Sequence, residues 1–500
     1  MKRVYDWNDI PRYRMQEIVG LLRPILGKTL GEIDKNNVFD KTLGNPKITG
    51  IAGDVIEQSV FEYKANSNQI PDLCIDGDYS ELKTTGVLDK GQGVWEAKEP
   101  CSITAVSISS IVEEEFDDSA FWHKAARILF VYYIYTSDKA VTAREYMGFP
   151  IKNFYYYVCP PDDRVVLEKD WTKVRDFLRG IHEAYPNEED RKTQYPNLST
   201  VLNRELEYLD TAPKYPNSPR FRFRRRFVTV IVQKSINNTY ENTGRHYLGL
   251  EDVERECAEY TKRYKGKTVK SLCKTFGIST DTINKQIIDK LIARMFGGQE
   301  AKKISNIEQL AKLGLQGQTV VMTEKGGRTE DMKLSACPLN VDEFKDPGIK
   351  FEDTEVYSFF TDYRLLCPIF TEHPKDTPLG PKVNYGENTF EGFKILRLDS
   401  EEIMNSLKKV WDEAHELVYE DKLTVTPMYL RDGSLRITPK TGEVMMETNL
   451  PKSKDNVIFF RGTGSDANDK ITINGLPMYR QNYWIKGSFI VEELKRQPFL

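Results

Sequence analysis

The acidic residues Asp72 and Glu81 stand close to Lys83 in the sequence, and their spacing suits a reaction on phosphate esters. The stretch predicts a hairpin. One strand leads out through Asp72, a polar Asp-Gly-Asp turn follows, and a second strand carries Ser80 to Thr84. Because side chains alternate along a strand, Glu81 and Lys83 point to the same face. We therefore expect two carboxylates, Asp72 and Glu81, with an ammonium group beside them.

Such a cluster suits hydrolysis of a phosphodiester. Carboxylates hold a hard divalent cation through oxygen, and Mg²⁺ is the expected ion. The metal polarises a phosphoryl oxygen and acidifies a bound water, while the lysine stabilises charge on the attacking water or on the phosphate. The ordinary alternative is an exposed hairpin with scattered charges, which would be favoured for an isolated acid-x-Lys triplet.

A third carboxylate upstream favours the catalytic interpretation. Gly53-Asp54-Val55-Ile56-Glu57 opens a stretch in which apolar and small residues recur at helical spacing. Glu57 borders this apolar face and can reach a site built on the hairpin. The residues that define the face are Ala52, Val55, Ile56, Ser59, Val60 and Tyr63.

Together, Gly53 to Glu57, Asp72 and Glu81-Leu82-Lys83-Thr84 resemble the catalytic core of the MutH family of mismatch-repair nicking endonucleases. They also resemble the larger Sau-type restriction endonucleases, which share that nuclease fold. The resemblance implies a mixed α/β fold of the PD-(D/E)xK superfamily, Mg²⁺ as cofactor, and cleavage of double-stranded DNA at GATC. It assigns Glu57, Asp72 and Glu81 to the metal, and Lys83 to the attacking water. Eight residues separate Asp72 from Glu81, slightly more than the family pattern, so we expect a longer hairpin turn.

Composition limits the other functions that the chain could have. In 500 residues, 39% hydrophobic and 29% charged residues fit a soluble protein of two or three domains. No apolar run is long enough to span a membrane, and we expect neither a membrane partner nor a nucleotide cofactor. Seven scattered cysteines without a C-x-x-C pair favour a reduced, cytoplasmic location, in a bacterium by the resemblance. The net charge of −4 means that any DNA surface must come from local patches.

A basic run from Arg220 to Phe227 is the first such patch. It interleaves five arginines with phenylalanines, a pattern in which rings anchor the chain while guanidinium groups reach phosphates. The alternative is a solvated charged face. Because the chain also carries a nuclease core, DNA binding is the favoured interpretation. In the MutH family an Arg-Pro-Lys segment precedes a basic-aromatic stretch, and its lysine reads bases. Ala212 replaces that arginine, and Arg222 falls where the family has a tyrosine, which leaves the target sequence open. The expected DNA-binding residues here are Pro213, Lys214, Arg222, Arg224 and Arg225.

Four short matches, all separated by about 235 residues, indicate an internal duplication. They pair Gly27 to Ile33 with Gly266 to Leu272, Val55 to Glu57 with Ile287 to Asp289, Tyr79 to Thr84 with Leu313 to Thr319, and Arg127 to Leu129 with Arg364 to Leu366.

The second copy differs where the catalytic residues should be. Gln316 and Gln318 stand in place of Glu81 and Lys83, and glutamine supplies neither the anionic nor the cationic charge. We therefore expect this copy to be catalytically inactive. Its DNA surface is expected at Arg461, Thr463, Trp484 and Lys486. An ordinary edge strand with a buried Trp484 is an equal alternative.

The sequence thus predicts two tandem MutH-like domains of mixed α/β class. Residues 1–234 would form the catalytic domain, 235–256 a linker, and 257–500 a DNA-binding regulatory domain that lacks the catalytic motif. The leading hypothesis is a type II restriction endonuclease that cuts a short site such as GATC. The second domain would then act as an allosteric or dimerising module, and a homodimer on DNA is left open. The alternatives are a mismatch-repair nicking endonuclease, or a DNA-binding regulator in which both sites are silent.

Overall fold

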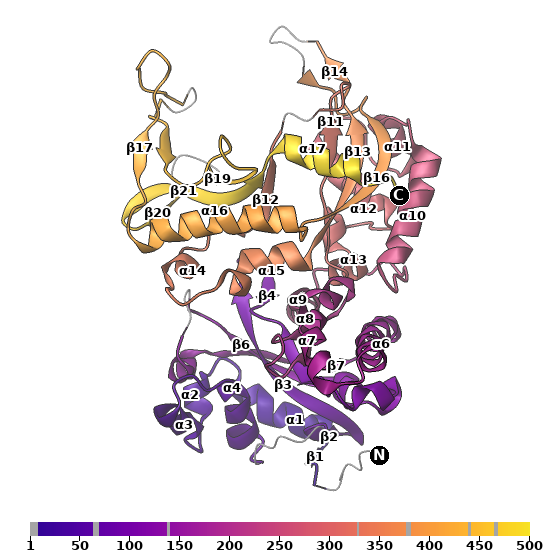
Figure 1. Ribbon diagram of the computed structural model, residues 1–500, viewed down its shortest axis with the longest axis vertical. Helices are drawn as coiled ribbons and strands as arrows, with labels where there is room; N and C mark the ends of the chain where they lie inside the picture. Colours follow the sequence, from indigo (N-terminus) through magenta and orange to yellow (C-terminus); the bar gives the residue numbers. More distant parts are fainter. Residues whose placement is uncertain are drawn as a thin grey trace.

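A computed structural model describes residues 9–63, 70–137, 141–327, 330–376, 382–438, 442–464 and 469–500. The fold is mixed α/β, as predicted. Figure 1 shows the first half of the chain, up to α9, in the lower part of the molecule and the second half, from α10 onward, in the upper part. Among the described residues, none of the helices is both long and apolar enough to cross a membrane.

The first half alternates helices with strands. Its elements are β1 (Arg12–Tyr13), α1 (Met15–Leu22), α2 (Leu30–Ile33), α3 (Lys41–Gly44), α4 (Ile51–Val55), β2 (Leu73–Ile75), β3 (Asp78–Asp89), β4 (Trp95–Ala97), β5 (Cys101–Ala105), α5 (Ala120–Ala125), β6 (Arg127–Ile134), β7 (Ile151–Val158), α6 (Pro161–Ala184), α7 (Glu188–Gln194), α8 (Asn197–Thr200), β8 (Leu209–Ala212), β9 (Arg220–Phe223) and α9 (Arg225–Ile236).

The central sheet of the first half has the order β1-β2-β3-β6-β7, with β4 added to β3. After Arg127, strand β6 consists of apolar and aromatic residues, as is typical of a strand that is covered on both faces. Leu129 and Val131 pack in the core under α1, α2 and α4, whereas Ile128 and Phe130 pack in the core that also holds α6 and α9. A second sheet, β5-β9-β8, lies beside this three-layer unit.

The second half contains a similar set of elements. They are α10 (Leu250–Tyr264), α11 (Val269–Thr275), α12 (Lys285–Met295), α13 (Glu308–Lys312), β10 (Leu315–Gly317), β11 (Val320–Met322), β12 (Met332–Pro338), α14 (Val341–Lys345), α15 (Glu355–Asp362), β13 (Arg364–Thr371), β14 (Pro374–Lys375), β15 (Lys382–Val383), β16 (Thr389–Arg397), α16 (Glu401–Tyr419), β17 (Val425–Pro427), β18 (Met446–Thr448), β19 (Ile458–Thr463), β20 (Lys470–Ile473), β21 (Leu476–Ile485) and α17 (Gly487–Arg496).

Backbone hydrogen bonds in the second half follow the pattern of the first. The Gly27 amide donates to the Ile151 carbonyl, and the Ile151 amide donates back to Lys28. In the second half Gly266 donates to Phe390, and Phe390 donates back to Lys267. Both glycines have positive φ angles, 79° and 77°, which a side chain would disfavour.

Strand pairing also repeats. β3 runs parallel to β6 with Glu81 opposite Ile128, and β10 runs parallel to β13 with Gln316 opposite Leu365. β6 and β13 then pair antiparallel with β7 and β16 respectively. Gln316 therefore occupies the same register position in the second half as Glu81 does in the first, as the sequence matches predicted.

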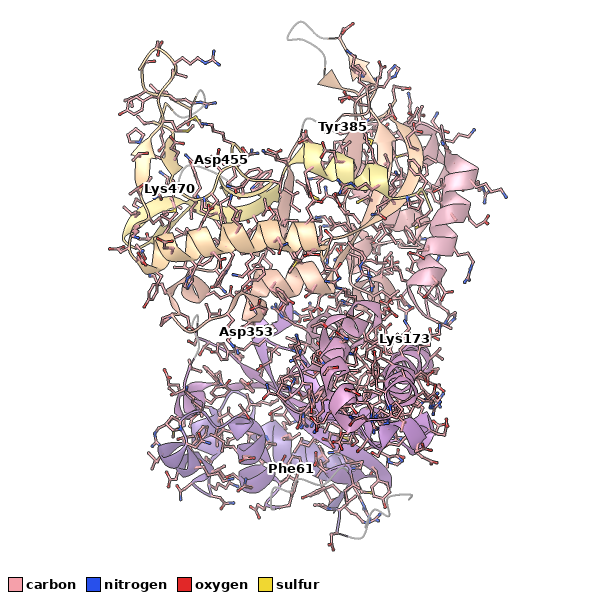
Figure 2. All side chains as sticks on the ribbon, in the orientation of Figure 1. Phe61, Lys173, Asp353, Tyr385, Asp455 and Lys470 are labelled. Atoms are coloured by element: carbon pink, nitrogen blue, oxygen red, sulfur yellow. The ribbon has the colours of Figure 1, made fainter. Side chains whose placement is uncertain are left out.

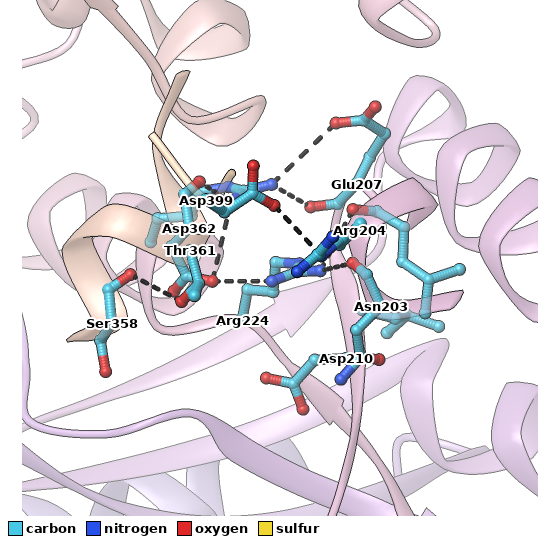
Figure 3. A network of polar contacts seen from close by, with 12 residues as sticks. Asn203, Arg204, Glu207, Asp210, Arg224, Ser358, Thr361, Asp362 and Asp399 are labelled. Carbon is cyan, nitrogen blue, oxygen red and sulfur yellow. Dashed lines mark hydrogen bonds and ion pairs between the residues drawn. The ribbon is translucent and has the colours of Figure 1, made fainter. Parts of the chain in front are cut away.

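The two halves meet through a shared core and several ion pairs. One hydrophobic cluster runs from Val87 in the first half to Phe393 in the second. Figure 3 shows Arg224 beside Asp362, the last residue of α15, with Nη1 and Oδ1 2.7 Å apart. Arg364 also crosses the junction and donates to Glu207 at 2.6 Å. Between the halves, α9 ends at Ile236 and α10 begins at Leu250, so the linker at 235–256 stays a prediction.

Candidate active site

The hairpin of β2 and β3 forms as predicted and carries the acidic residues. Ile75 lies opposite Asp78, which leaves only Asp76 and Gly77 in the turn. Both have positive φ, 51° and 95°, as a two-residue type I′ turn requires. The expectation of a longer turn is wrong, because the residues between Asp72 and Glu81 are paired in the strands apart from this two-residue turn.

Glu81 lies at the centre of the site and is only 2% exposed. Its Oε1 accepts hydrogen bonds from Lys83 Nζ at 2.7 Å and from Lys124 Nζ at 3.0 Å. The predicted pairing of Glu81 with Lys83 is therefore present. Proximity to Glu81 and Asp72 raises the pKa of Lys83 despite its burial, so the ammonium group stays charged.

Asp72 lies immediately before β2 and faces the same site. Its Oδ2 accepts a hydrogen bond from the Leu82 amide at 3.0 Å, which ties it to the middle of β3. Burial, and then the nearby charge of Glu81, raise the pKa of Asp72 to about 6, although Lys124 and Lys83 partly oppose the shift. The carboxylate is therefore held close to a second negative charge.

Glu57 comes from the other side of the site. Helix α4 continues directly into a π-helical segment, Ile56–Val60, whose apolar residues Ile56 and Val60 are buried. Such π-helical turns often lie at functional sites. Burial raises the pKa of Glu57 to about 7, and the charge of Asp72 adds to the effect. Phe61, labelled in Figure 2, follows this segment in the lower part of the molecule.

The donor set fits a divalent cation with few protein ligands. Among residues 9–63, 70–137 and the other described ranges, no three His, Cys, Asp or Glu side chains are close enough to enclose a metal ion. Mg²⁺, however, is commonly held by one or two carboxylates and keeps several waters. Glu81 Oε2 is buried and accepts no hydrogen bond from the described residues, although Lys124 Nζ lies 3.0 Å away. Crowded carboxylates with raised pKa values and an unsatisfied oxygen are what a bound cation would relieve.

Lys124 is the residue that the sequence did not predict. It lies on α5, 43 positions from Glu81, and only the packing of α5 against β3 brings the two together. Ser119 begins this helix by accepting a hydrogen bond from the Trp122 amide. The local sequence offers a capping serine five residues before a lysine, and this pattern indicates a helix rather than a catalytic residue.

The DNA-binding residues predicted in the first half have different surroundings. Pro213 and Lys214 are exposed in the connection between β8 and β9. Arg222 is half-buried, and its Nε donates to Asp210 at 2.6 Å. Arg225 donates to the Ala97 carbonyl at 2.7 Å and pairs with Glu96.

Arg224 requires a correction. It is 5% exposed and its guanidinium group is engaged by Asp362 and by the carbonyls of Asn203 and Leu206. It therefore stabilises the junction between the halves and does not reach DNA phosphates. The rings of the basic run are buried as expected, at Phe221, Phe223 and Phe227.

Three of the four residues predicted in the second half lie on one sheet, and the fourth, Lys486, follows its last strand. Arg461 on β19 stacks over the ring of Trp484 on β21, with 4.7 Å between the guanidinium carbon and the ring centroid. Thr463 Oγ1 accepts from Lys333 Nζ at 3.0 Å, and Lys486 precedes α17. β21 pairs on both sides, with β12 and β19, and Trp484 is only half-buried. The alternative of an edge strand with a buried Trp484 is therefore wrong.

Comparisons with known proteins agree with this geometry. A family model described as the DNA mismatch repair enzyme MutH matches residues 61–170. The match includes Asp72, Glu81, Lys83 and Lys124 and begins just after Glu57. The chain is also 21% identical over 485 residues to the type II restriction enzyme Sau3AI of Staphylococcus aureus, covering 89% of this chain and 92% of that protein. The resemblance to MutH and to Sau-type restriction endonucleases, predicted from the sequence, is confirmed by both comparisons.

Proposed function

We propose that the chain is a type II restriction endonuclease that hydrolyses phosphodiester bonds of double-stranded DNA with the help of Mg²⁺. The observation that carries this proposal is the convergence of Asp72, Glu81, Lys83 and Lys124 in the region that the MutH family model matches. Similarity to Sau3AI over most of the chain supports restriction rather than repair. A GATC-like target is proposed from the same similarity.

Each residue has a role that its position suits. Asp72 and Glu81 would hold the cation, and Glu57 would face it from the opposite side of the site. When bound, Mg²⁺ would neutralise phosphate charge and acidify a water. Lys83 approaches Glu81 from the same strand face and would stabilise the attacking hydroxide. Lys124 is buried against Glu81 and would orient that carboxylate while balancing its charge.

We also propose that the second half is a copy of the nuclease fold that binds DNA without cutting it. The repeated strand register supports the duplication, and Gln316 at the register position of Glu81 supports the loss of cutting. Arg461 and Trp484, which stack in the second sheet, support a nucleic-acid surface, since guanidinium groups and aromatic rings both suit DNA.

Incubation with supercoiled plasmid and Mg²⁺ tests the function. Linear product is expected, since a restriction enzyme breaks both strands. Open circles alone would favour the nicking alternative, and unchanged plasmid would favour the non-catalytic regulator.

Asp72→Ala, Glu81→Ala and Lys83→Ala should each abolish cutting while duplex binding persists, because transition-state stabilisation is lost rather than ground-state affinity. Gln316→Ala, at the equivalent register of the second half, is the matched control and should cut normally.

A further inference from the structure

A pocket of about 550 Å³ opens in the second half at the place that corresponds to the active site of the first. Its walls come from α12, from the end of β10, from β12 and from the Arg461–Trp484 pair. Its lining residues are Lys285, Asp289, Lys303, Gly317, Gln318, Thr319, Glu330, Asp331, Met332, Lys333, Arg461 and Trp484. It is therefore polar and charged, with four basic and three acidic side chains.

The catalytic charges of the first half have been replaced around this pocket. Gln316 holds the register position of Glu81, and Gln318 follows it two residues later, as Lys83 follows Glu81. Lys124 also has no cationic counterpart. It lies five residues after Ser119, the N-cap of α5, whereas the residue five positions after Thr354, the N-cap of α15, is Phe359. Asp289 remains, and its Oδ1 accepts a hydrogen bond from Thr319 at 3.0 Å.

The pocket is lined instead by basic residues, among them Lys285 and Lys303. Lys285 stands four residues before Asp289, where Gly53 stands four residues before Glu57. Lys303 comes from the segment before α13. Both lysines are exposed, and within the described part of the chain no ion pair involves a cation between Arg255 and Lys312. Arg461, by contrast, is paired with Asp331 at 2.7 Å, and Lys333 donates to Thr463 at 3.0 Å.

We propose that this pocket is a phosphate site that works without a metal. The proposal rests on the proposed DNA-binding role of the second half. In the first half, carboxylates require a cation between themselves and a phosphate. In the second half, Lys285 and Lys303 would contact the phosphate oxygens directly through charge-assisted hydrogen bonds. Trp484 and Arg461 form a wall on which the adjoining sugar or base can pack.

The alternative of a surviving metal site is less consistent with the lining. Of the three acidic residues in the lining, Asp331 is occupied by Arg461 and by the Gly487 amide, Asp289 is hydrogen-bonded to Thr319, and Glu330 is exposed. Two lysines without a carboxylate partner would also repel a cation at this place. The basic side chains therefore favour an anion.

The test uses the full-length chain carrying Lys83→Ala and Lys214→Ala, which silence cutting and weaken recognition by the first half. Duplex affinity is measured by fluorescence anisotropy across a salt series, once with EDTA and once with Mg²⁺. We expect binding to persist in EDTA. Adding Lys285→Ala and Lys303→Ala should weaken it about tenfold and reduce the salt slope by about two, because each lysine neutralises one phosphate. Lys408→Ala with Lys409→Ala, two exposed lysines on α16, is the charge-matched control and should change neither quantity.

Three outcomes separate the interpretations. Binding of duplex that requires Mg²⁺ would overturn the proposal. Unchanged duplex affinity and salt slope in the pocket variant would also overturn it, provided that the variant binds inorganic phosphate and the mononucleotide no differently from its parent. Titration with inorganic phosphate and with a mononucleotide distinguishes a free phosphate from a DNA backbone. Binding of either probe that the pocket variant abolishes, with duplex affinity unchanged, would support a phosphate site but assign it to a free ligand. Plasmid cleavage by the pocket variant in an otherwise wild-type chain should persist, so failure of the pocket and failure of the nuclease function remain distinguishable.

Discussion

At the scale of single residues, the three carboxylates of the candidate active site differ in how their charge is balanced. Glu81 has two ammonium groups within 3.0 Å, whereas Asp72 has one backbone amide and Glu57 is raised to a pKa of about 7 by burial and by its acidic neighbours. A buried carboxylate without a cation beside it is costly. Without a metal, the buried negative charges therefore lower the stability of the folded chain, and the size of this effect depends on pH.

Glu57→Gln should stabilise the metal-free chain at alkaline pH. The folded-state pKa values of Glu57 and Asp72 lie above their ordinary values of 4.5 and 3.8. Protonation therefore favours the folded state, and the stability that it contributes is lost as the pH rises through about 6 to 7. The substitution removes one of the two acids and should add about 1 to 3 kcal/mol at pH 8 and nothing at pH 4. Thermal unfolding at both pH values in EDTA measures the effect.

The exposed Glu183 on α6 supplies the control, since Glu183→Gln should leave the melting temperature unchanged at both pH values. Mg²⁺ should raise the melting temperature of the wild-type chain at pH 8 more than that of Glu57→Gln, because bound metal stabilises only the folded state. Destabilisation by Glu57→Gln at pH 8 would show that Glu57 is already neutralised by a partner.

At the scale of elements, periodicity and spacing predicted what depends on local sequence. The hairpin of β2 and β3 forms because Asp76 and Gly77 accept positive φ, and the helix of Glu57 forms because its apolar residues recur at helical spacing. Lys124 could not be predicted, since nothing local to α5 indicates that the helix packs against β3.

The basic run also shows what local sequence cannot predict: here it predicted a DNA contact where the structure has an internal ion pair. Five arginines interleaved with rings are typical of a DNA surface, and the rings are indeed buried. The run, however, crosses from β9 into α9, and α9 packs against α13 of the second half. Arg224 consequently meets Asp362, which lies 138 positions away in the chain. Sequence alone does not distinguish a guanidinium group that binds DNA from one that binds a distant carboxylate.

Lys214→Ala and Arg224→Ala should therefore have different consequences. Lys214 is exposed between β8 and β9, so its loss should alter or abolish site preference in a cleavage-mapping assay with no change in melting temperature. Loss of Arg224 removes the hydrogen bond to the partly buried Asp362 but leaves Arg226 near it, so it should cost about 1 to 3 kcal/mol of stability. A stable Arg224→Ala variant with weakened DNA binding would show instead that Arg224 contacts DNA.

At the scale of the whole molecule, the junction makes the two halves mutually dependent. The cluster that contains Val87 and Phe393 is continuous, and buried ion pairs such as Arg364 with Glu207 and Lys312 with Asp163 cross it. A partner bound by the second half can therefore influence the first through packed contacts, without a flexible connection. The proposed duplication rests in the sequence on four weak matches, whereas nothing in the sequence indicated the extent of the shared core.

A restriction enzyme must break two strands, whereas the first half of this chain offers one candidate catalytic cluster. If the second half binds another copy of the target, DNA bound there would favour the cutting state of the first half, which requires two sites with coupled free energies. Plasmids with two target sites should then be cut faster than plasmids with one, and an added oligonucleotide carrying the site should accelerate the one-site substrate. Arg461→Ala with Lys486→Ala should remove this acceleration and leave slow cleavage, since both residues lie far in the sequence from Asp72 and Glu81. Initial rates at enzyme concentrations below saturation are the measurement. Equal rates on the two plasmids would mean that the second half only holds the enzyme on DNA.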